Sequence, residues 1–303
     1  MKRIFIILTL GLALLAEDTG GRAGKFMLLG SSPRAVGMGQ GMTAIDNMPE
    51  AFSYNPAALI GIQGYQVGGS YQTLALDRST YSAYIAGNIK NDAAFAISWV
   101  HAGTDIQGRN GDGIPTGDLE NGDDNIGIVF SKKVLRYLAF GGSLRYMQSK
   151  LHEMLSYTAG FDVGLIYRHR QTGLNAGVSV ANIAMNHSWN SSELYGEGYN
   201  ADEAIPLTVR TGVAWRPEEK PYTAAVDLEI TEDRDPRIHG GLSYVPIQYL
   251  QLRAGMDHTS PTAGLSVNIP IGDSWTGYVD YAISGEKYGL PPKHLFGLRV
   301  MFK

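Results

Sequence analysis

The side chains of this 303-residue chain that could perform chemistry are few and scattered. Cysteine is absent, which excludes disulfides, thiolate metal sites, a cysteine nucleophile and an acylated cysteine anchor. The seven histidines lack the HxxxH and HExxH spacings of a zinc site, and no G-x-S-x-G nucleophile motif occurs. We therefore predict a protein without cofactor or metal that is not an enzyme. A Ser–His pair assembled across strands stays as the catalytic alternative, because it would leave no local trace in the sequence.

Two local patterns resemble ligand sites but lack essential parts. Gly37-x-Gly39-x-Gly41 has neither the third-glycine spacing nor the preceding strand of a nucleotide-binding loop. Gly103–Asp124 contains six carboxylates, the ligands that calcium prefers, but lacks the leading acid and the bidentate glutamate of an EF-hand. We expect a solvated loop there, with calcium binding as the alternative. The net charge of -4 gives no reason to expect nucleic acid.

Charged residues also occur inside hydrophobic segments, at alternate positions. In Tyr157–Tyr167, Tyr, Ala, Phe, Val and Leu occupy one set of positions, and Thr158, Gly160 and Asp162 fall on the other. Such alternation is typical of a β-strand with two unlike faces. The polar faces of such segments carry charges of both signs: Arg145, Asp162, Arg210, Asp227, Glu229, Arg253, Asp280 and Arg299. These mixed signs favour ion pairs that fill a lumen over a polar permeation path, which stays as the alternative.

Fourteen alternating segments follow one another from Tyr65 onward, and strands of this length cross a bilayer when tilted. The segments are Tyr65–Leu74, Ser79–Asn88, Ala93–Ala102, Asn125–Lys132, Leu138–Gln148, Tyr157–Tyr167, Leu174–Ile183, Leu207–Trp215, Tyr222–Ile230, Ile238–Val245, Leu250–Asp257, Thr262–Ile269, Trp275–Ser284 and His294–Phe302. The predicted fold class is therefore all-β, a transmembrane antiparallel β-barrel of about fourteen strands.

The connections between these segments alternate in length. Those after even-numbered segments are short, such as Ile89–Asp92 and Pro270–Ser274, whereas Gly103–Asp124 and Ala184–Pro206 are long. Outer-membrane barrels have short periplasmic turns and longer extracellular loops. The 18% of charged residues is also low, as expected for a surface that faces lipid. These features favour a barrel in the bacterial outer membrane over a secreted sandwich or propeller.

The first residues have the pattern of an export signal. Lys2 and Arg3 precede the apolar run Ile4–Leu15, which is too short to span a bilayer. We expect a signal peptide over residues 1–16, with a buried N-terminal helix as the alternative. Residues 17–62 do not alternate, and we expect them to form a hatch or plug segment inside a barrel of residues 63–303.

The non-alternating segment carries a motif, SSPRAVGMGQGMTAIDNMPEAFSYNPAAL, over residues 31–59. It resembles the N-terminal signature of the PorV/PorQ family, which belongs to the FadL-like outer-membrane barrels. The C-terminal Gly297–Lys303 is similar to the terminal strand read by barrel-insertion machinery, with an extra lysine. The resemblance implies a FadL-type barrel with an N-terminal hatch. The motif places these residues in it: Gly37, Met38, Gly39, Gly41, Asn55, Pro56 and Ala57.

Two functions follow from this resemblance. PorV-like members serve type IX secretion and surface attachment, so the long loops would dock protein partners, with Trp189, Tyr195 and Tyr199 as anchors. FadL-like members pass small hydrophobic molecules across the outer membrane, so a hydrophobic ligand is the alternative. We predict the secretion function, with outer-membrane lipid and proteins of a secretion assembly as partners.

Overall fold

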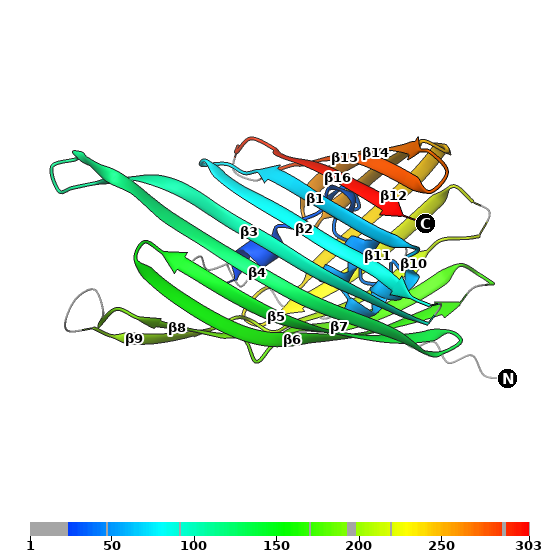
Figure 1. Ribbon diagram of the computed structural model, residues 1–303, viewed down its shortest axis with the longest axis horizontal. Coiled ribbons are helices and arrows are strands. Elements are labelled where there is room, and N and C mark those ends of the chain that lie inside the picture. Colours follow the sequence, from blue (N-terminus) through cyan, green and yellow to red (C-terminus); the bar gives the residue numbers. More distant parts are fainter. Residues whose placement is uncertain are drawn as a thin grey trace.

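The structure is a computed structural model that describes residues 24–46, 48–90, 92–169, 171–192, 198–218, 220–286 and 289–302. The expected signal peptide lies outside these residues. The described chain forms an elongated, tilted barrel with a short helical segment inside it (Figure 1). In these ranges, no helix combines the length and the hydropathy needed to cross a membrane.

Fourteen antiparallel strands close the barrel, which confirms the predicted fold class. Their order is β1-β16-β15-β14-β13-β12-β11-β10-β7-β6-β5-β4-β3-β2. Closure is made by β1 and β16, which pair from Tyr65↔Phe302 to Thr73↔His294, so the sheet has no free edge, as a bilayer requires. The strands are β1 (Tyr65–Thr73), β2 (Arg78–Ile89), β3 (Ala93–Arg109), β4 (Pro115–Leu135), β5 (Leu138–Leu151), β6 (Met154–His169), β7 (Leu174–Ile183), β10 (Thr208–Trp215), β11 (Tyr222–Thr231), β12 (Arg237–Ile247), β13 (Leu250–Asp257), β14 (Ser260–Ile271), β15 (Trp275–Ser284) and β16 (Lys293–Phe302).

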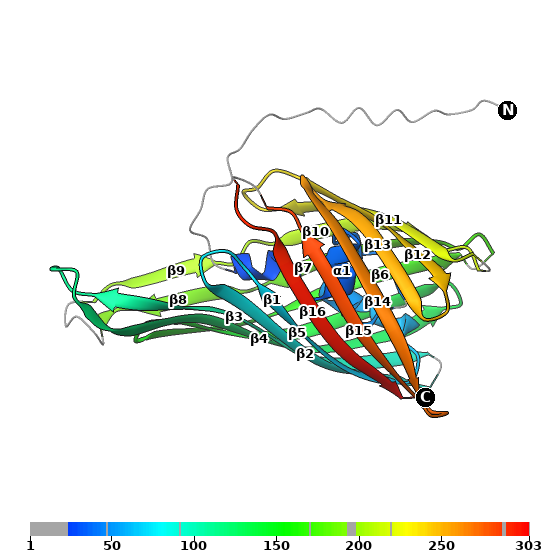
Figure 2. The ribbon, with the colours of Figure 1, turned by 90° about the horizontal axis from the view of Figure 1, so that it is seen from above.

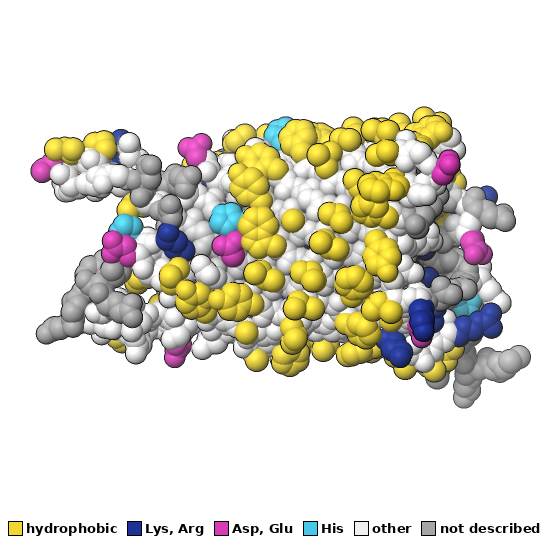
Figure 3. Space-filling model, in the orientation of Figure 1, with side chains coloured by type: hydrophobic (Ala, Val, Ile, Leu, Met, Phe, Trp, Pro, Cys, Tyr) yellow, Lys and Arg dark blue, Asp and Glu magenta, His cyan; other side chains and the backbone are white. Residues whose placement is uncertain are grey.

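The outer face of the barrel is hydrophobic. Leu144, Val226 and Leu298 are 67%, 54% and 67% exposed, and Figure 3 shows hydrophobic side chains in a broad band around the middle of the barrel. Aromatic rings pair across neighbouring strands, as in Tyr71–Tyr81 at 5.0 Å and Trp275–Phe302 at 4.5 Å between centroids. Amphipathic rings at the strand ends fit the two interfaces of a membrane. The barrel is therefore a membrane-spanning barrel of the outer-membrane type.

The two ends of the barrel differ in the length of their connections, but one connection that we predicted to be a loop is mostly strand. The even-numbered predicted connections are tight turns at one end, which we call the tight-turn end and which is periplasmic by the rule for such barrels. The Gly103–Asp124 connection, expected to be a long loop, is instead mostly strand, because β3 and β4 stay paired out to Arg109↔Pro115. Backbone pairing continues beyond the apolar band without hydrophobic alternation, so the sequence pattern did not reveal it.

The other long connection carries a small sheet of its own. Within the expected loop Ala184–Pro206, β8 (Asn186–Asn190) pairs with β9 (Asn200–Ala204). Both this hairpin and the β3–β4 hairpin extend from the same end of the barrel, opposite the tight turns (Figure 2).

Residues 24–62, as far as they are described, lie inside the lumen, and we call them the plug segment. It consists of η1 (Lys25–Leu28), α1 (Pro33–Gly37), η2 (Pro49–Ser53) and η3 (Pro56–Gly61). Helix α1 contacts β13 to β16, and η3 contacts β3 to β6, so the segment crosses the lumen from one wall to the other. Met38, Met42 and Ala57 are fully buried, together with Ile166 of the wall.

Candidate functional site

Glycines of the barrel wall form the surface on which the plug segment lies. Three cross-strand pairs face it: Gly241↔Gly255, Gly212↔Gly177 and Gly141↔Gly164. A Cβ on Gly241 would lie 2.4 Å from the carbonyl oxygen of Met38, and one on Gly177 would lie 2.2 Å from that of Thr43. Glycine is required at Gly241, Gly255, Gly177 and Gly141 because the backbone of the plug segment touches the backbone of the wall there, whereas at Gly164 and Gly212 the space is taken by the side chains of Asn55 and Asp227.

The predicted hatch residues lie along this contact. Gly37 faces Gly264, with 3.2 Å from its added Cβ to the Gly264 Cα. Gly39 has a φ of 59°, and a Cβ there would lie 2.4 Å from the Gly240 carbonyl oxygen, so both conformation and space demand glycine. Gly41 lies against Gly240 in the same way, at 3.2 Å. The glycine run therefore packs against the wall and makes no phosphate-binding loop.

The Asn55-Pro56-Ala57 triplet starts η3 and ties it to the barrel. The buried Asn55 side chain accepts a hydrogen bond from the Ala57 N–H at 3.0 Å, which caps the helix, while Pro56 occupies its first turn. The Asn55 amide donates to the carbonyl of Thr43 at 2.8 Å and to that of Leu165, on β6, at 3.0 Å. One side chain thus joins two parts of the plug segment to the wall.

The predicted lumen charges form three ion pairs between neighbouring strands. Arg145 lies 3.6 Å from Asp162, and Arg299 lies 3.2 Å from Asp280. Arg210 contacts Glu229 directly, and its guanidinium lies 5.0 Å from the centroid of the Tyr54 ring.

Asp227 and Arg253 have different surroundings from those three pairs. The Asp227 carboxylate, 1% exposed, accepts hydrogen bonds from the backbone N–H groups of Met42 at 2.7 Å and Thr43 at 2.8 Å. Arg253 donates to Ser266 at 2.8 Å. Asp227 therefore binds the plug segment itself, while Arg253 joins β13 to β14.

Sequence reasoning missed the charges that the plug segment brings into the lumen. Arg34 and Glu50 form a buried ion pair at 3.2 Å, and the Tyr84 hydroxyl of β2 donates to Glu50 at 3.0 Å. His239 lies 3.5 Å from Glu229 and 2.9 Å from Asp257. Arg34 and Glu50 could have been singled out as opposite charges within an otherwise small and apolar segment. The position of His239 depends on strand register, which the local sequence does not specify.

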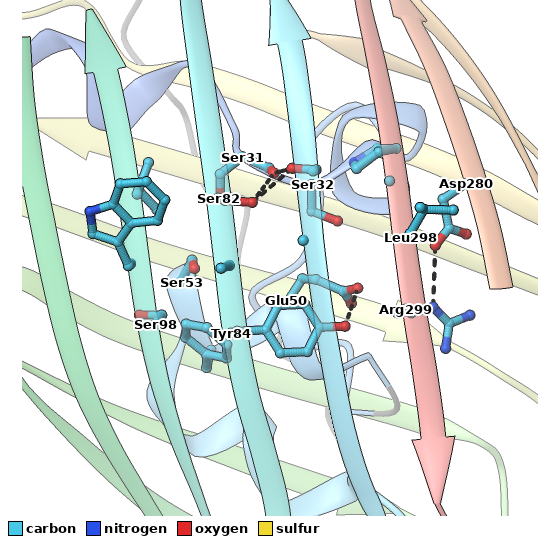
Figure 4. Close-up of a pocket in the computed structure, with 18 residues that line it drawn as sticks. Ser31, Ser32, Glu50, Ser53, Ser82, Tyr84, Ser98, Asp280, Leu298 and Arg299 are labelled. Carbon is cyan, nitrogen blue, oxygen red and sulfur yellow. Dashed lines mark hydrogen bonds and ion pairs between the residues drawn. The ribbon is translucent and has the colours of Figure 1, made fainter. Parts of the chain in front are cut away.

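A pocket at β1, β2 and β16 lies between the barrel wall and the plug segment (Figure 4). Its lining includes Ala83 and Leu298, which point outward and are exposed, and Glu50, Tyr84 and Arg299, which are buried inside. Small residues surround it: Ser31, Ser32, Gly69, Ser70, Ser82, Ser98 and Gly297. The hydroxyl of Ser82 donates to the Ser31 carbonyl at 3.0 Å across this gap.

A second cavity lies between the start of the plug segment and the wall. Its volume is about 80 Å³, against about 30 Å³ for the pocket at β1, β2 and β16. Phe26, Met27 and Leu29 form its apolar side, and Arg145 and Arg210 are part of its polar side. An apolar cavity of roughly 150 Å³ is needed to bind benzene. Neither space therefore accommodates a small aromatic molecule while the plug segment stays in this position.

The predicted partner-binding anchors are only partly described. Tyr199 is 78% exposed, and Trp189, on β8, is half-buried with its ring stacked on His187 at 5.9 Å between centroids. Tyr195 lies outside the described residues.

The structure also brings a Ser–His contact together beneath the β8–β9 hairpin. His187 Nδ1 lies 2.9 Å from the Ser156 hydroxyl, and its Nε2 lies 3.3 Å from that of Ser149. His187 and Ser156 are at most 1% exposed and Ser149 is 5% exposed, so a substrate has no access to either hydroxyl. Across the described residues, no group of three or more histidines and carboxylates could hold a metal ion.

A closed fourteen-stranded barrel with an internal plug segment defines an outer-membrane β-barrel. No family model matches the chain, and no curated protein matches it. Among solved structures, it is similar to the toluene transporter TbuX of Ralstonia pickettii, with a TM-score of 0.66 and 13% identity over 92% of this chain and 100% of that one. The toluene transporter TodX of Pseudomonas putida has a TM-score of 0.62 and 14% identity over 88% of this chain and 96% of that one. A FadL homologue of Pseudomonas aeruginosa has a TM-score of 0.63 and 9% identity over 90% of this chain and 98% of that one. The fold is that of the FadL-like barrels.

Proposed function

We propose that this protein passes small hydrophobic molecules across the outer membrane. The observation that carries the proposal is the pocket at β1, β2 and β16, whose lining combines residues of both faces of the wall with residues of the plug segment. A hydrophobic molecule dissolves in the bilayer, so a path through the side of the wall suits it better than a water-filled channel. The toluene transporters with the same fold support this hypothesis over protein secretion.

The arrangement described here is the closed one. Plug residues are tightly packed against wall glycines, and the spaces of about 30 and 80 Å³ hold water-sized molecules only. Transport therefore requires the plug segment to move away from the wall. The polar contacts of Asp227 and Asn55 hold it in place until then.

A matched pair of substitutions tests the route. Ala83→Phe adds a ring to the lipid-facing surface of β2 next to the pocket, whereas Val226→Phe adds one to the lipid-facing surface of β11, away from it. Cells that express the native barrel should take up radiolabelled toluene faster than cells without it, and Ala83→Phe should remove most of the gain while Val226→Phe keeps it. Equal uptake with and without the native barrel would refute the proposal.

One structural observation is compatible with a protein partner at the opposite end of the barrel from the tight turns. The β3–β4 and β8–β9 hairpins project beyond the barrel at the same end and expose Tyr199. These hairpins provide a surface for a protein partner. The PorV/PorQ resemblance remains the only support for type IX secretion, and the similar solved structures named above are transporters or a FadL homologue.

A further inference from the structure

The tight-turn end of the barrel carries an excess of positive charge. The described residues in and next to the tight turns from β2 to β11 include seven basic side chains against the exposed acids Asp92 and Glu218. The basic residues are Lys90, Lys132, Lys133, Arg136, Arg168, Arg216 and Lys220. Because the whole chain has a net charge of -4, the charge is unevenly distributed, and Figure 3 shows Lys and Arg side chains at the lower right, over the tight turns.

Two cavities open among these residues, and both are much larger than those inside the barrel. One, of about 420 Å³, is lined by Lys90, Lys133 and Arg168 together with the end of the plug segment. The charged residues that line the other, of about 470 Å³, are three basic ones, Arg168, Arg216 and Lys220, and two acids, Asp46 and Glu218. Arg168 borders both, so the two form adjoining parts of one basic mouth.

This mouth already holds a carboxylate, which belongs to the plug segment. Asp46 is 2% exposed, with its two oxygens 2.6 Å from Arg168 Nε and 3.2 Å from Arg216 Nη2. The two arginine side chains remain 21% and 36% exposed. A guanidinium has five N–H donors, so a second carboxylate can approach from the open side. The chemistry that the mouth recognises is therefore carboxylate.

We propose that this mouth docks an acidic segment of a periplasmic protein, whose carboxylates compete with Asp46 for Arg168 and Arg216. The proposal goes beyond the transport function. From the β2–β3 turn to the β10–β11 turn the basic residues span six strand spacings, about 29 Å along the wall. An extended peptide of roughly nine residues covers that length, whereas a free anion does not. Lipid headgroups approach from outside the strands, while these cavities lie at the mouth of the lumen and touch the plug segment.

Binding of a fluorescent nona-glutamate peptide to the full-length barrel in a non-ionic detergent tests the proposal. The native protein should bind it with an affinity that falls steeply with added salt. Arg216→Gln with Lys220→Gln should weaken binding at least tenfold, whereas Arg78→Gln with Arg109→Gln, at the other end, should leave it unchanged. Asp46→Asn removes the internal competitor and should strengthen binding several-fold.

Three results would overturn the proposal. The first is equal binding by the native protein and a folded Arg216/Lys220 variant, whose replaced side chains are partly or fully exposed. The second is unchanged or weaker binding by Asp46→Asn in a folded barrel. The third is a mouth that binds phosphatidylglycerol nanodiscs or inorganic phosphate but no peptide. Uptake of toluene does not enter this assay, so its outcome is independent of the transport proposal.

Discussion

Replacing Gly141 by alanine should loosen the plug segment, whereas the same change at its neighbour Gly142 should not. A Cβ on Gly141 would lie 2.3 Å from the backbone nitrogen of Ala57 and from the carbonyl carbon of Pro56. At Gly142 the nearest atom, the carbonyl oxygen of Asp162, would be 3.8 Å away, which is ordinary contact. The two residues are consecutive in β5 and point to opposite sides of the wall.

The magnitude follows from the size of the overlap. Contact at 3.4 Å or more requires the plug backbone to retreat by about 1.1 Å from Gly141→Ala. Overpacking of this kind costs about 1–3 kcal/mol. Both variants also gain about 0.4–1 kcal/mol from a less flexible unfolded chain, and this gain cancels in the comparison. The free energy for local opening of the plug segment should therefore be about 1–3 kcal/mol lower in Gly141→Ala than in Gly142→Ala.

Hydrogen exchange of the purified barrel, followed by mass spectrometry, measures that difference. The N–H groups of Ala57 and Ala58 donate hydrogen bonds to Asn55, so they exchange with solvent when η3 opens and moves away from the barrel wall. A loss of about 1–3 kcal/mol corresponds to exchange about 5 to 150 times faster. Strand amides of β10 and β11, far from the substitution, serve as the internal reference. Equal exchange of Ala57 and Ala58 in the two variants would show that the wall glycines do not hold the plug segment.

Two further substitutions test the other contacts of the site. Asp227→Ala removes two charge-assisted hydrogen bonds from the N–H groups of Met42 and Thr43, which together contribute about 3 kcal/mol. These two amides should therefore exchange roughly a hundred times faster in Asp227→Ala, and Asp227→Asn should have an intermediate effect. Unchanged protection of the two amides would contradict the role of this carboxylate. Burial lowers the pKa of His187, although the negative charges of Asp123 and Glu203 oppose the shift. Below a pH of about 6.5 the imidazole therefore binds a proton more readily when the β8–β9 hairpin is undocked than when it is docked. Docking of the hairpin should weaken as the pH falls through this range. The fluorescence of Trp189, whose ring is stacked on His187, measures the docking of the hairpin as a function of pH. His187→Gln should abolish its pH dependence.

The barrel was predictable because each strand carries its own pattern. Alternation in Tyr157–Tyr167 requires no knowledge of the neighbouring strands, and the same holds for the other thirteen segments. The hydrophobic alternation stops where the strands leave the membrane, because an apolar outer face is no longer needed there. Beyond the membrane, β3 and β4 remain paired through Gly108↔Gly117, but water can face both sides, so glycine and aspartate replace the alternating hydrophobic residues.

The candidate site was less predictable because its contacts depend on strand register. Arg210 and Glu229 are 19 residues apart, and a shift of one residue would turn their side chains to opposite faces. The same dependence explains why Asp227 was predicted to form an ion pair and instead binds the backbone of the plug segment. Its position two residues before Glu229 specifies the face but not the partner.

The glycine content of the chain, 38 residues, has a physical cause in this arrangement. A plug segment that presents its backbone to the wall leaves no space for side chains, so the wall must be glycine wherever the two backbones touch, as at Gly177 and Gly241. At these glycines the wall presents no side chain, and the plug backbone is fixed there by polar contacts such as those of Asp227 and Asn55. Elsewhere plug side chains such as Met38 and Leu59 are packed in buried clusters with the wall. The passage of a hydrophobic molecule that we propose therefore requires the plug segment to give up both the polar contacts and part of this buried packing when it moves.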